Sequence, residues 1–127
     1  MGILGLWRQA RGTVMRKEYD DLMFRIIGAN KHARAAFLNN IDQTIDRVVE
    51  TYSAASPAER KALLEELQGA AKNLWTGGDW PSALGLGISC LNAESRFTPG
   101  EDAAYVRVET DRLIKEARAS GPGLLGD

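Results

Sequence analysis

The chain has 127 residues, of which 44% are hydrophobic and 26% are charged. This composition excludes a disordered or fibrous protein, and the length suits a single domain with one core of moderate size. Sixteen basic and seventeen acidic residues leave a net charge of −1, which lacks the basic excess of a dedicated nucleic-acid binder, so we expect no nucleic acid as a partner.

The first seventeen residues carry apolar and basic side chains and no acidic one. On a helix, such a segment suits an anionic membrane surface or an acidic partner, and it equally suits packing over the ends of its own bundle. We treat residues 1–12 as a basic and apolar arm that is able to become helical. The residues expected to contact a partner or a membrane are Ile3, Leu4, Trp7, Arg8, Arg11, Arg16 and Lys17.

Apolar residues at steps of three and four predict two helices, at about 13–28 and 30–53. Gly28-Ala29-Asn30 separates them, and the Asn30 side chain is suited to cap the second helix. The expected inward residues of the two helices are Met15, Tyr19, Leu22, Ile26, Ala33, Phe37, Ile41, Ile45, Val48 and Tyr52.

The sequence Ser56-Pro57-Ala58-Glu59 has the pattern of a capping box with proline in the first turn, and it predicts a helix at about 57–75. Gly77-Gly78 is suited to end that helix, and Asp79 to cap the next one at about 80–94, which makes a tight helical hairpin. The expected inward residues are Leu63, Leu64, Leu67, Ala71, Leu74 and Trp75, followed by Trp80, Ala83, Leu84, Gly87, Ile88 and Leu91.

The hairpin at about 64–95 has small, apolar or aromatic residues at a characteristic spacing, which are Ala71, Leu74, Gly78, Trp80, Ala83 and Cys90. In these residues it resembles a single tetratricopeptide repeat. Gly87 and Ser95 depart from the pattern, which has a bulky aromatic residue and a proline at these places, and no second copy follows. The resemblance implies peptide binding, whereas an ordinary helical hairpin accounts for the same residues.

Glycines inside the fourth predicted helix need an explanation, because each costs about 1 kcal/mol of helix stability relative to alanine. Close approach of a neighbouring backbone to Gly85 or Gly87 is one explanation. The other is a shallow groove, formed by Trp80, Gly85 and Gly87, that accepts a ligand or a partner helix.

Thr98-Pro99-Gly100-Glu101 repeats the signal for a helix start and predicts a fifth helix at about 99–119, with Val106, Leu113, Ile114 and Ala117 inward. We expect the glycine-rich residues 120–127 to form a flexible tail. No stretch alternates with the period of a strand. The sequence therefore predicts an all-α protein, a single-domain bundle of four to five helices over residues 13–119.

The chain offers few groups for catalysis, since it contains one histidine and one cysteine. We expect His32 to be solvated and Cys90 to be a small core residue, so the sequence predicts no enzymatic activity, no catalytic residues, no metal site and no cofactor. A single cysteine excludes an intramolecular disulfide and favours the cytoplasm.

These observations predict a non-enzymatic protein–protein interaction or regulatory protein, whose partner is another protein or a second copy of itself. One alternative is a protein held at the periphery of an anionic membrane by its N-terminal segment. The other is a helical bundle that binds a small ligand or a peptide, with the tetratricopeptide-like hairpin taking part.

Overall fold

The computed structural model describes the backbone of residues 3–126 and the side chains of residues 11–119. The described backbone forms five helices and no strand, which confirms the prediction of an all-α helical bundle. The helices are α1 (Ile3–Ile27), α2 (Lys31–Ala54), α3 (Pro57–Thr76), α4 (Trp80–Ser95) and α5 (Glu101–Gly126).

Three predicted helix boundaries are confirmed by hydrogen bonds. The Asn30 side chain accepts from the N–H of Ala33 at 2.8 Å and caps α2. At α3 both halves of the capping box form, and the bond from the Ser56 N–H lowers the pKa of Glu59. Between α3 and α4 the chain reverses at Gly78, whose φ of +93° favours glycine, and Asp79 caps α4.

The start of α5 differs from the prediction. The helix begins at Glu101, and the carbonyl of Gly100 accepts its first hydrogen bond, from the N–H of Ala104. The Thr98 hydroxyl instead donates to the carbonyl of Glu94 at 2.9 Å, so it closes the end of α4 and does not cap α5. The positive φ of Gly100, +106°, turns the chain between the two helices.

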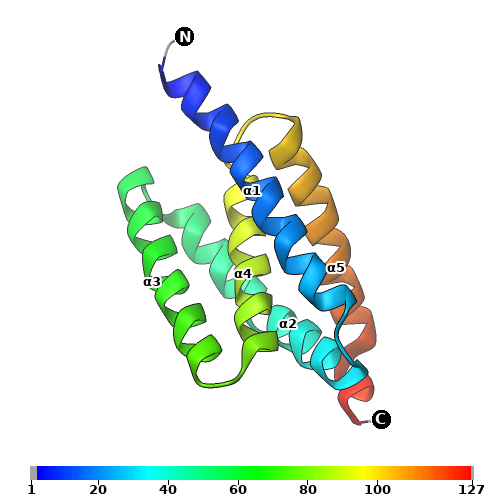
Figure 1. Cartoon of the computed structure of the whole chain (residues 1–127). Helices are drawn as coiled ribbons and strands as arrows, with labels where there is room; N and C mark the ends of the chain where they lie inside the picture. Colours follow the sequence, from blue (N-terminus) through cyan, green and yellow to red (C-terminus); the bar gives the residue numbers. More distant parts are fainter. Residues whose placement is uncertain (1–2, 127) are drawn as a thin grey trace.

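The outer ends of the first and last helices also extend past the predicted bounds. α1 begins at Ile3, so the expected arm is continuous with the first helix, and its first turns project beyond the rest of the bundle (Figure 1). α5 continues to Gly126, beyond the predicted end near residue 119. The flexibility expected of residues 120–127 stays a prediction.

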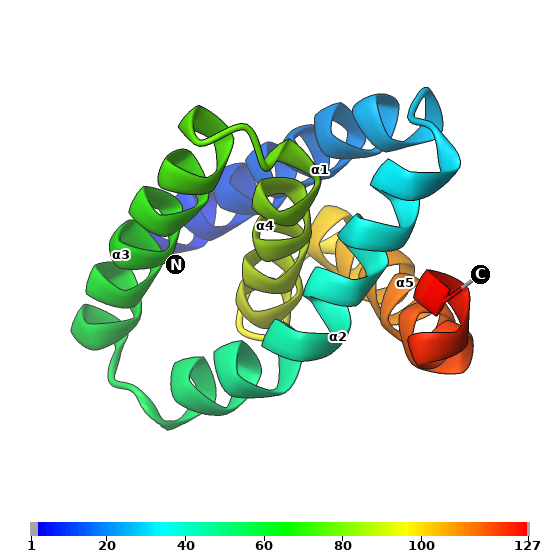
Figure 2. The same ribbon diagram turned by 90° about the horizontal axis from the view of Figure 1, so that it is seen from below.

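α4 lies at the centre of the fold and packs against all four other helices. α2 crosses behind it, α1 and α5 lie to one side, and α3 lies to the other (Figures 1 and 2). This position explains why the α4 side chains from Ala83 to Ser95 are buried almost all round the helix, with Gly87 half-exposed. The predicted stripe of α4 covered only part of that buried surface.

The apolar interior has two parts. The larger part joins α1, α2, α4 and α5 and includes Met15, Phe37, Ile41, Ile88 and Val106, which are all essentially inaccessible to solvent. The smaller part lies among α2, α3 and α4, and its buried members are Val48, Tyr52, Leu86, Cys90 and Ala93. α3 belongs only to this smaller part.

α3 is a peripheral helix that packs chiefly on α4. None of its residues is buried, and its apolar face, formed by Leu63, Leu64, Leu67, Ala71 and Leu74, is only half-covered. The prediction that Trp75 points inward is wrong, because this side chain is 43% exposed. α3 therefore retains apolar surface that the rest of the bundle does not fully bury.

Buried polar groups on α4 are tied into the bundle by hydrogen bonds. The Asn92 amide donates to Thr110 Oγ1 and to Asp111 Oδ1, both at 2.8 Å, and its Oδ1 accepts from Arg96. These bonds hold the C-terminal half of α4 against α5. Since a buried amide without partners would cost stability, we assign Asn92 a structural role.

Candidate binding groove

A groove with an apolar floor runs between α1 and α3 across the surface of α4, and we call it the α1–α3 groove. Its main section has a volume of about 480 Å³, which lies within the range of ligand-binding sites. The groove exists because α1 and α3 both pack on α4 and make little contact with each other. The floor consists of the α4 residues Ala83, Leu84, Gly87, Cys90 and Leu91.

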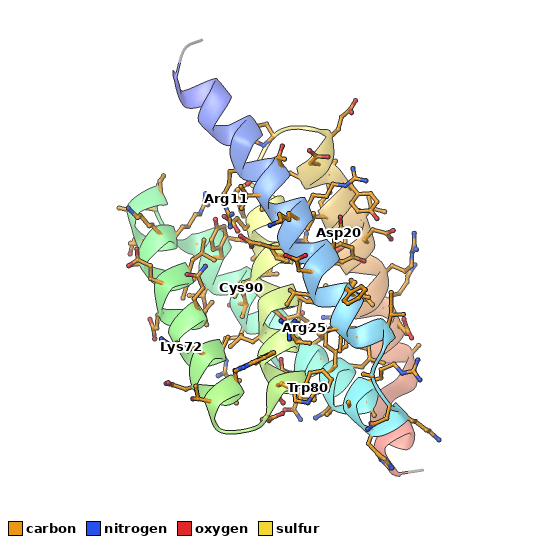
Figure 3. The ribbon with its side chains drawn as sticks, in the orientation of Figure 1. Arg11, Asp20, Arg25, Lys72, Trp80 and Cys90 are labelled. Atoms are coloured by element: carbon orange, nitrogen blue, oxygen red, sulfur yellow. The ribbon has the colours of Figure 1, made fainter. Side chains whose placement is uncertain are left out.

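The two walls are amphipathic. The α3 wall has apolar residues facing the floor and polar residues at the rim, and its members are Leu64, Leu67, Gln68, Ala71, Lys72 and Trp75. The α1 wall has one apolar residue and four charged ones, which are Leu22, Arg11, Glu18, Asp21 and Arg25. Figure 3 shows Arg11, Cys90 and Arg25 one below another in the space between α1 and α3.

An ion pair marks one end of the main section. Arg11 of α1 donates to both carboxylate oxygens of Glu94 on α4, at 2.5 and 2.6 Å, and to Glu18 at 3.0 Å. Glu94 is only 7% exposed. Burial by itself would lower the pKa of the Arg11 guanidinium, but the hydrogen bonds and charges of Glu94 and Glu18 outweigh it and raise that pKa above its ordinary value. Arg11 therefore stays charged and joins α1 to α4.

At the other end, a cation stacks on an aromatic ring across the groove. The guanidinium carbon of Arg25 on α1 lies 4.9 Å from the centre of the Trp75 ring on α3. This distance is typical of a cation–π interaction. Both side chains are exposed, so the contact can break without disturbing the core. It therefore closes this end of the groove only loosely.

A second section, of about 470 Å³, continues the groove along α3 past the Arg11–Glu94 pair. The two sections share Arg11, Leu64, Gln68 and Glu94. In the second section Arg60 of α3 donates to the carbonyl of Tyr52 at 2.9 Å and lies 3.8 Å from the centre of the Phe97 ring. Arg60 thereby ties the start of α3 to the end of α2.

No family model, curated protein or solved structure matches this chain.

The residues predicted to form a groove are separated by the structure. Gly87 lies on the groove floor, where a Cβ atom would be 3.4 Å from Leu22 Cδ1. Gly85 instead faces α2, where a Cβ atom would lie 2.9 Å from the carbonyl oxygen of Phe37, so the expected close approach of a backbone is confirmed there. Trp80 packs against the larger part of the core.

The residues predicted to contact a partner or a membrane fall into three groups. Arg11 is held by Glu94 and Glu18, and Arg16 pairs with Asp102 at 3.0 Å and lies over the Tyr105 ring. Lys17 is exposed. The side chains of Ile3, Leu4, Trp7 and Arg8 lie outside the described residues, so their role as contacts stays a prediction.

The single cysteine and the single histidine occupy different environments. Cys90 is buried in the groove floor, and burial together with the nearby negative charge of Glu94 raises the pKa of its thiol to about 12. A thiol with that pKa is protonated at neutral pH and is a poor nucleophile. His32 is exposed in the first turn of α2. Among the described residues, no cluster of histidine, cysteine and acidic side chains is suited to hold a metal ion.

The groove walls were not recognisable as a site from the sequence. Leu64, Leu67 and Ala71 were expected in the core, whereas the structure leaves them half-exposed above α4. The pairing of Arg11 with Glu94 was also missed, because the two residues are 83 positions apart and nothing local links them.

Proposed function

We propose that the protein is a non-enzymatic interaction domain that receives an amphipathic helix of a partner protein in the α1–α3 groove. The observation that carries this proposal is the half-covered apolar face of α3 above the apolar floor of α4. A helix placed between α1 and α3 would cover the side chains that α4 alone leaves accessible. Helix-in-groove recognition uses this kind of surface.

The length of the groove favours a helix over a small molecule. α3 has 20 residues and therefore spans about 30 Å, and the two groove sections together follow it from Pro57 to Trp75. A small ligand would fill one section of about 480 Å³ and leave the other empty. An extended amphipathic partner would occupy both sections.

The charges on the rims indicate the chemistry of that partner. Both rims carry charges of both signs, which are Arg11, Glu18, Asp21 and Arg25 on α1 and Lys61, Glu65 and Lys72 on α3. A matching helix would therefore carry basic and acidic residues along both edges of its apolar stripe.

Display selection tests the proposal even though the partner is unidentified. A library of helix-forming peptides would be selected against the full chain and then tested for binding to two variants. Ala71→Arg places a charged side chain in the groove, whereas Ala62→Arg makes the same change at an exposed position of α3 that lines neither groove section. Neither residue is fully buried, but Ala71 packs against the smaller part of the core, so circular dichroism checks that Ala71→Arg remains folded.

We expect selected peptides with apolar residues at steps of three and four that bind the wild type and Ala62→Arg but not Ala71→Arg. Amide hydrogen exchange should then show protection in α3 and α4 on binding. The proposal fails if no peptide shows this dependence on residue 71. Stabilisation by small apolar compounds, with no peptide selected, would replace it with the ligand-binding alternative.

Location follows as part of the same proposal. We place the protein in the cytoplasm, and the support is its single cysteine, which is buried and free. No helix in the described part of the chain is long and apolar enough to span a bilayer. Fractionation of the source cells with the tagged full chain tests this placement, which a secreted product would refute.

A further inference from the structure

The corner between α1 and α2 combines exposed apolar side chains with an acid-free stretch of sequence. Phe24 and Ile27, in the last two turns of α1, are 82% and 73% exposed, more than any other large hydrophobic residue in the described part of the chain. Residues 22–41 contain no aspartate or glutamate, although acidic residues slightly outnumber basic ones in the chain. We propose that this corner docks on an anionic lipid surface.

The apolar and basic groups of the corner lie close together. Phe24 and Ile27 are three residues apart on one face of α1, and α2 begins only four residues after Ile27. The first turn of α2 then presents Lys31 and Arg34, both exposed. Cations beside inserted apolar side chains are the arrangement by which peripheral proteins bind anionic headgroups.

The size of the patch favours a membrane over a protein partner. A specific protein–protein interface needs about 800 Å² on each side, with complementary shape, and two side chains at a corner supply only a fraction of that area. A lipid surface needs no shape complementarity, because acyl chains and headgroups rearrange around the inserted residues.

The corner is separate from both the N-terminal segment and the α1–α3 groove. It lies at the end of α1 opposite to the projecting first turns, so it is distinct from the segment predicted to contact membranes (Figure 1). Phe24 and Ile27 do not line the groove, which α1 contacts through residues such as Leu22 and Arg25. A chain docked by this corner therefore keeps the groove accessible, and the two proposals can fail independently.

Flotation with lipid vesicles tests the proposal on the full chain. The vesicles consist of phosphatidylcholine alone or of phosphatidylcholine mixed with phosphatidylglycerol. The variants are Phe24→Ser with Ile27→Ser, and Lys31→Glu with Arg34→Glu. Val108→Ser is the matched control, since Val108 on α5 is 55% exposed and lies outside the corner. Circular dichroism checks that every variant remains helical.

We expect binding to the anionic vesicles, weakened by salt, and little binding to phosphatidylcholine alone. Removing each cation should lower the partition coefficient about fivefold, and charge reversal should lower it further. The Phe24 and Ile27 double variant should lose at least about tenfold, because burial of two large apolar side chains drives insertion. Val108→Ser should bind like the wild type.

A fluorescent label reports insertion directly. Ile27→Cys in a Cys90→Ala background carries an environment-sensitive dye at the corner, and its emission should shift to the blue on anionic vesicles. A second full-length variant, Trp7→Ser with Arg8→Ser, separates the corner from the N-terminal segment.

Three results would overturn the proposal. The first is no binding of the wild type to anionic vesicles. The second is loss of binding in the Trp7 and Arg8 variant while both corner variants bind like the wild type, which would assign the membrane contact to the N-terminal segment. The third is a dimer of the wild type in analytical sedimentation together with a monomer of the Phe24 and Ile27 variant, when the two proteins bind vesicles equally well. That result would make the corner an interface between two copies of the chain.

Discussion

Replacing Gly85 with alanine tests how closely α4 approaches α2. A Cβ atom at residue 85 would lie 2.6 Å from Asn40 Oδ1, 2.9 Å from Asn40 Cβ and 2.9 Å from the carbonyl oxygen of Phe37. Real Cβ atoms essentially never come so near to other heavy atoms. The Asn40 amide can rotate, but the Phe37 carbonyl belongs to the α2 backbone. The two helices must therefore move apart.

Two effects of opposite sign determine the size of the change. Alanine is favoured over glycine inside a helix by about 1 kcal/mol. Overpacking in a well-packed interior typically costs about 1–3 kcal/mol. Here the clash lies between α2 and α4, the two helices that pack most extensively on each other, and both contribute to the larger part of the core. The difference between the two effects is a loss of up to about 2 kcal/mol, so we expect Gly85→Ala to lower the free energy of unfolding by up to that amount.

Two further glycines serve as internal controls. A Cβ atom at Gly69 of α3 meets no atom within 4 Å, so Gly69→Ala should raise the free energy of unfolding by up to about 1 kcal/mol. At Gly87 the nearest atom is a flexible Leu22 methyl group at 3.4 Å, so Gly87→Ala should be close to neutral while it narrows the groove.

Urea denaturation followed by circular dichroism would rank the three variants. The reasoning is refuted if Gly85→Ala is as stable as Gly69→Ala, since the α2–α4 contact would then have room for a methyl group.

Three more predictions concern buried polar groups. Arg11→Met should cost about 3 kcal/mol of stability, because it leaves the Glu94 carboxylate buried without its partner. In a double-mutant cycle, the double variant with Glu94→Met should recover much of this loss. Losses that simply add would contradict the pairing of Arg11 with Glu94. Burial raises the thiol pKa of Cys90 from the ordinary value of 9.0 to about 12 in the folded protein. The unfolded chain therefore loses the thiol proton at lower pH than the folded protein does. The contribution of Cys90 to stability is complete below pH 9, and it falls by up to about 1.4 kcal/mol per pH unit between pH 9 and 12. Urea titrations at several pH values should show that Cys90→Ala lacks this dependence of the free energy of unfolding on pH. Equal pH dependence in the wild type and Cys90→Ala would refute burial of the thiol. Asn92→Ala should lower the free energy of unfolding by about 2–3 kcal/mol, because it removes the hydrogen bonds to Thr110 and Asp111. Asn73→Ala, at an exposed position of α3, should change the unfolding midpoint little. Equal effects of the two substitutions would contradict a structural role for Asn92.

Much of the fold was predictable because helix termini are set by local chemistry. Ser56 with Glu59, Asn30 and Asp79 all cap the helices that the sequence predicted, and each bond joins residues three apart. Thr98 does not cap α5, and the reason is again local, because its hydroxyl donates to the carbonyl of Glu94 one turn earlier in the chain. Hydroxyl side chains make both kinds of bond, and sequence alone does not decide between them.

The groove was less predictable, because it depends on which helices meet. An apolar stripe shows that a helix needs a neighbour but does not say how many neighbours it has, and so Leu67 and Trp75 of α3 were expected in the core. The sequence marks Gly85 and Gly87 alike, because both are glycines inside a helix. The distinction between Gly85, which packs on α2, and Gly87, which faces the groove, required the positions of α2 and α1.

The attachment of α3 through essentially one neighbouring helix has a consequence for local unfolding. With no fully buried side chain of its own, α3 should detach and re-form at a lower free energy than the global transition requires, so its amides should exchange with solvent before those of α4. Any molecule that seats beside α3 would then slow that exchange. Its measured affinity would include the free energy needed to hold α3 in place, so association and the rigidity of this helix are thermodynamically linked.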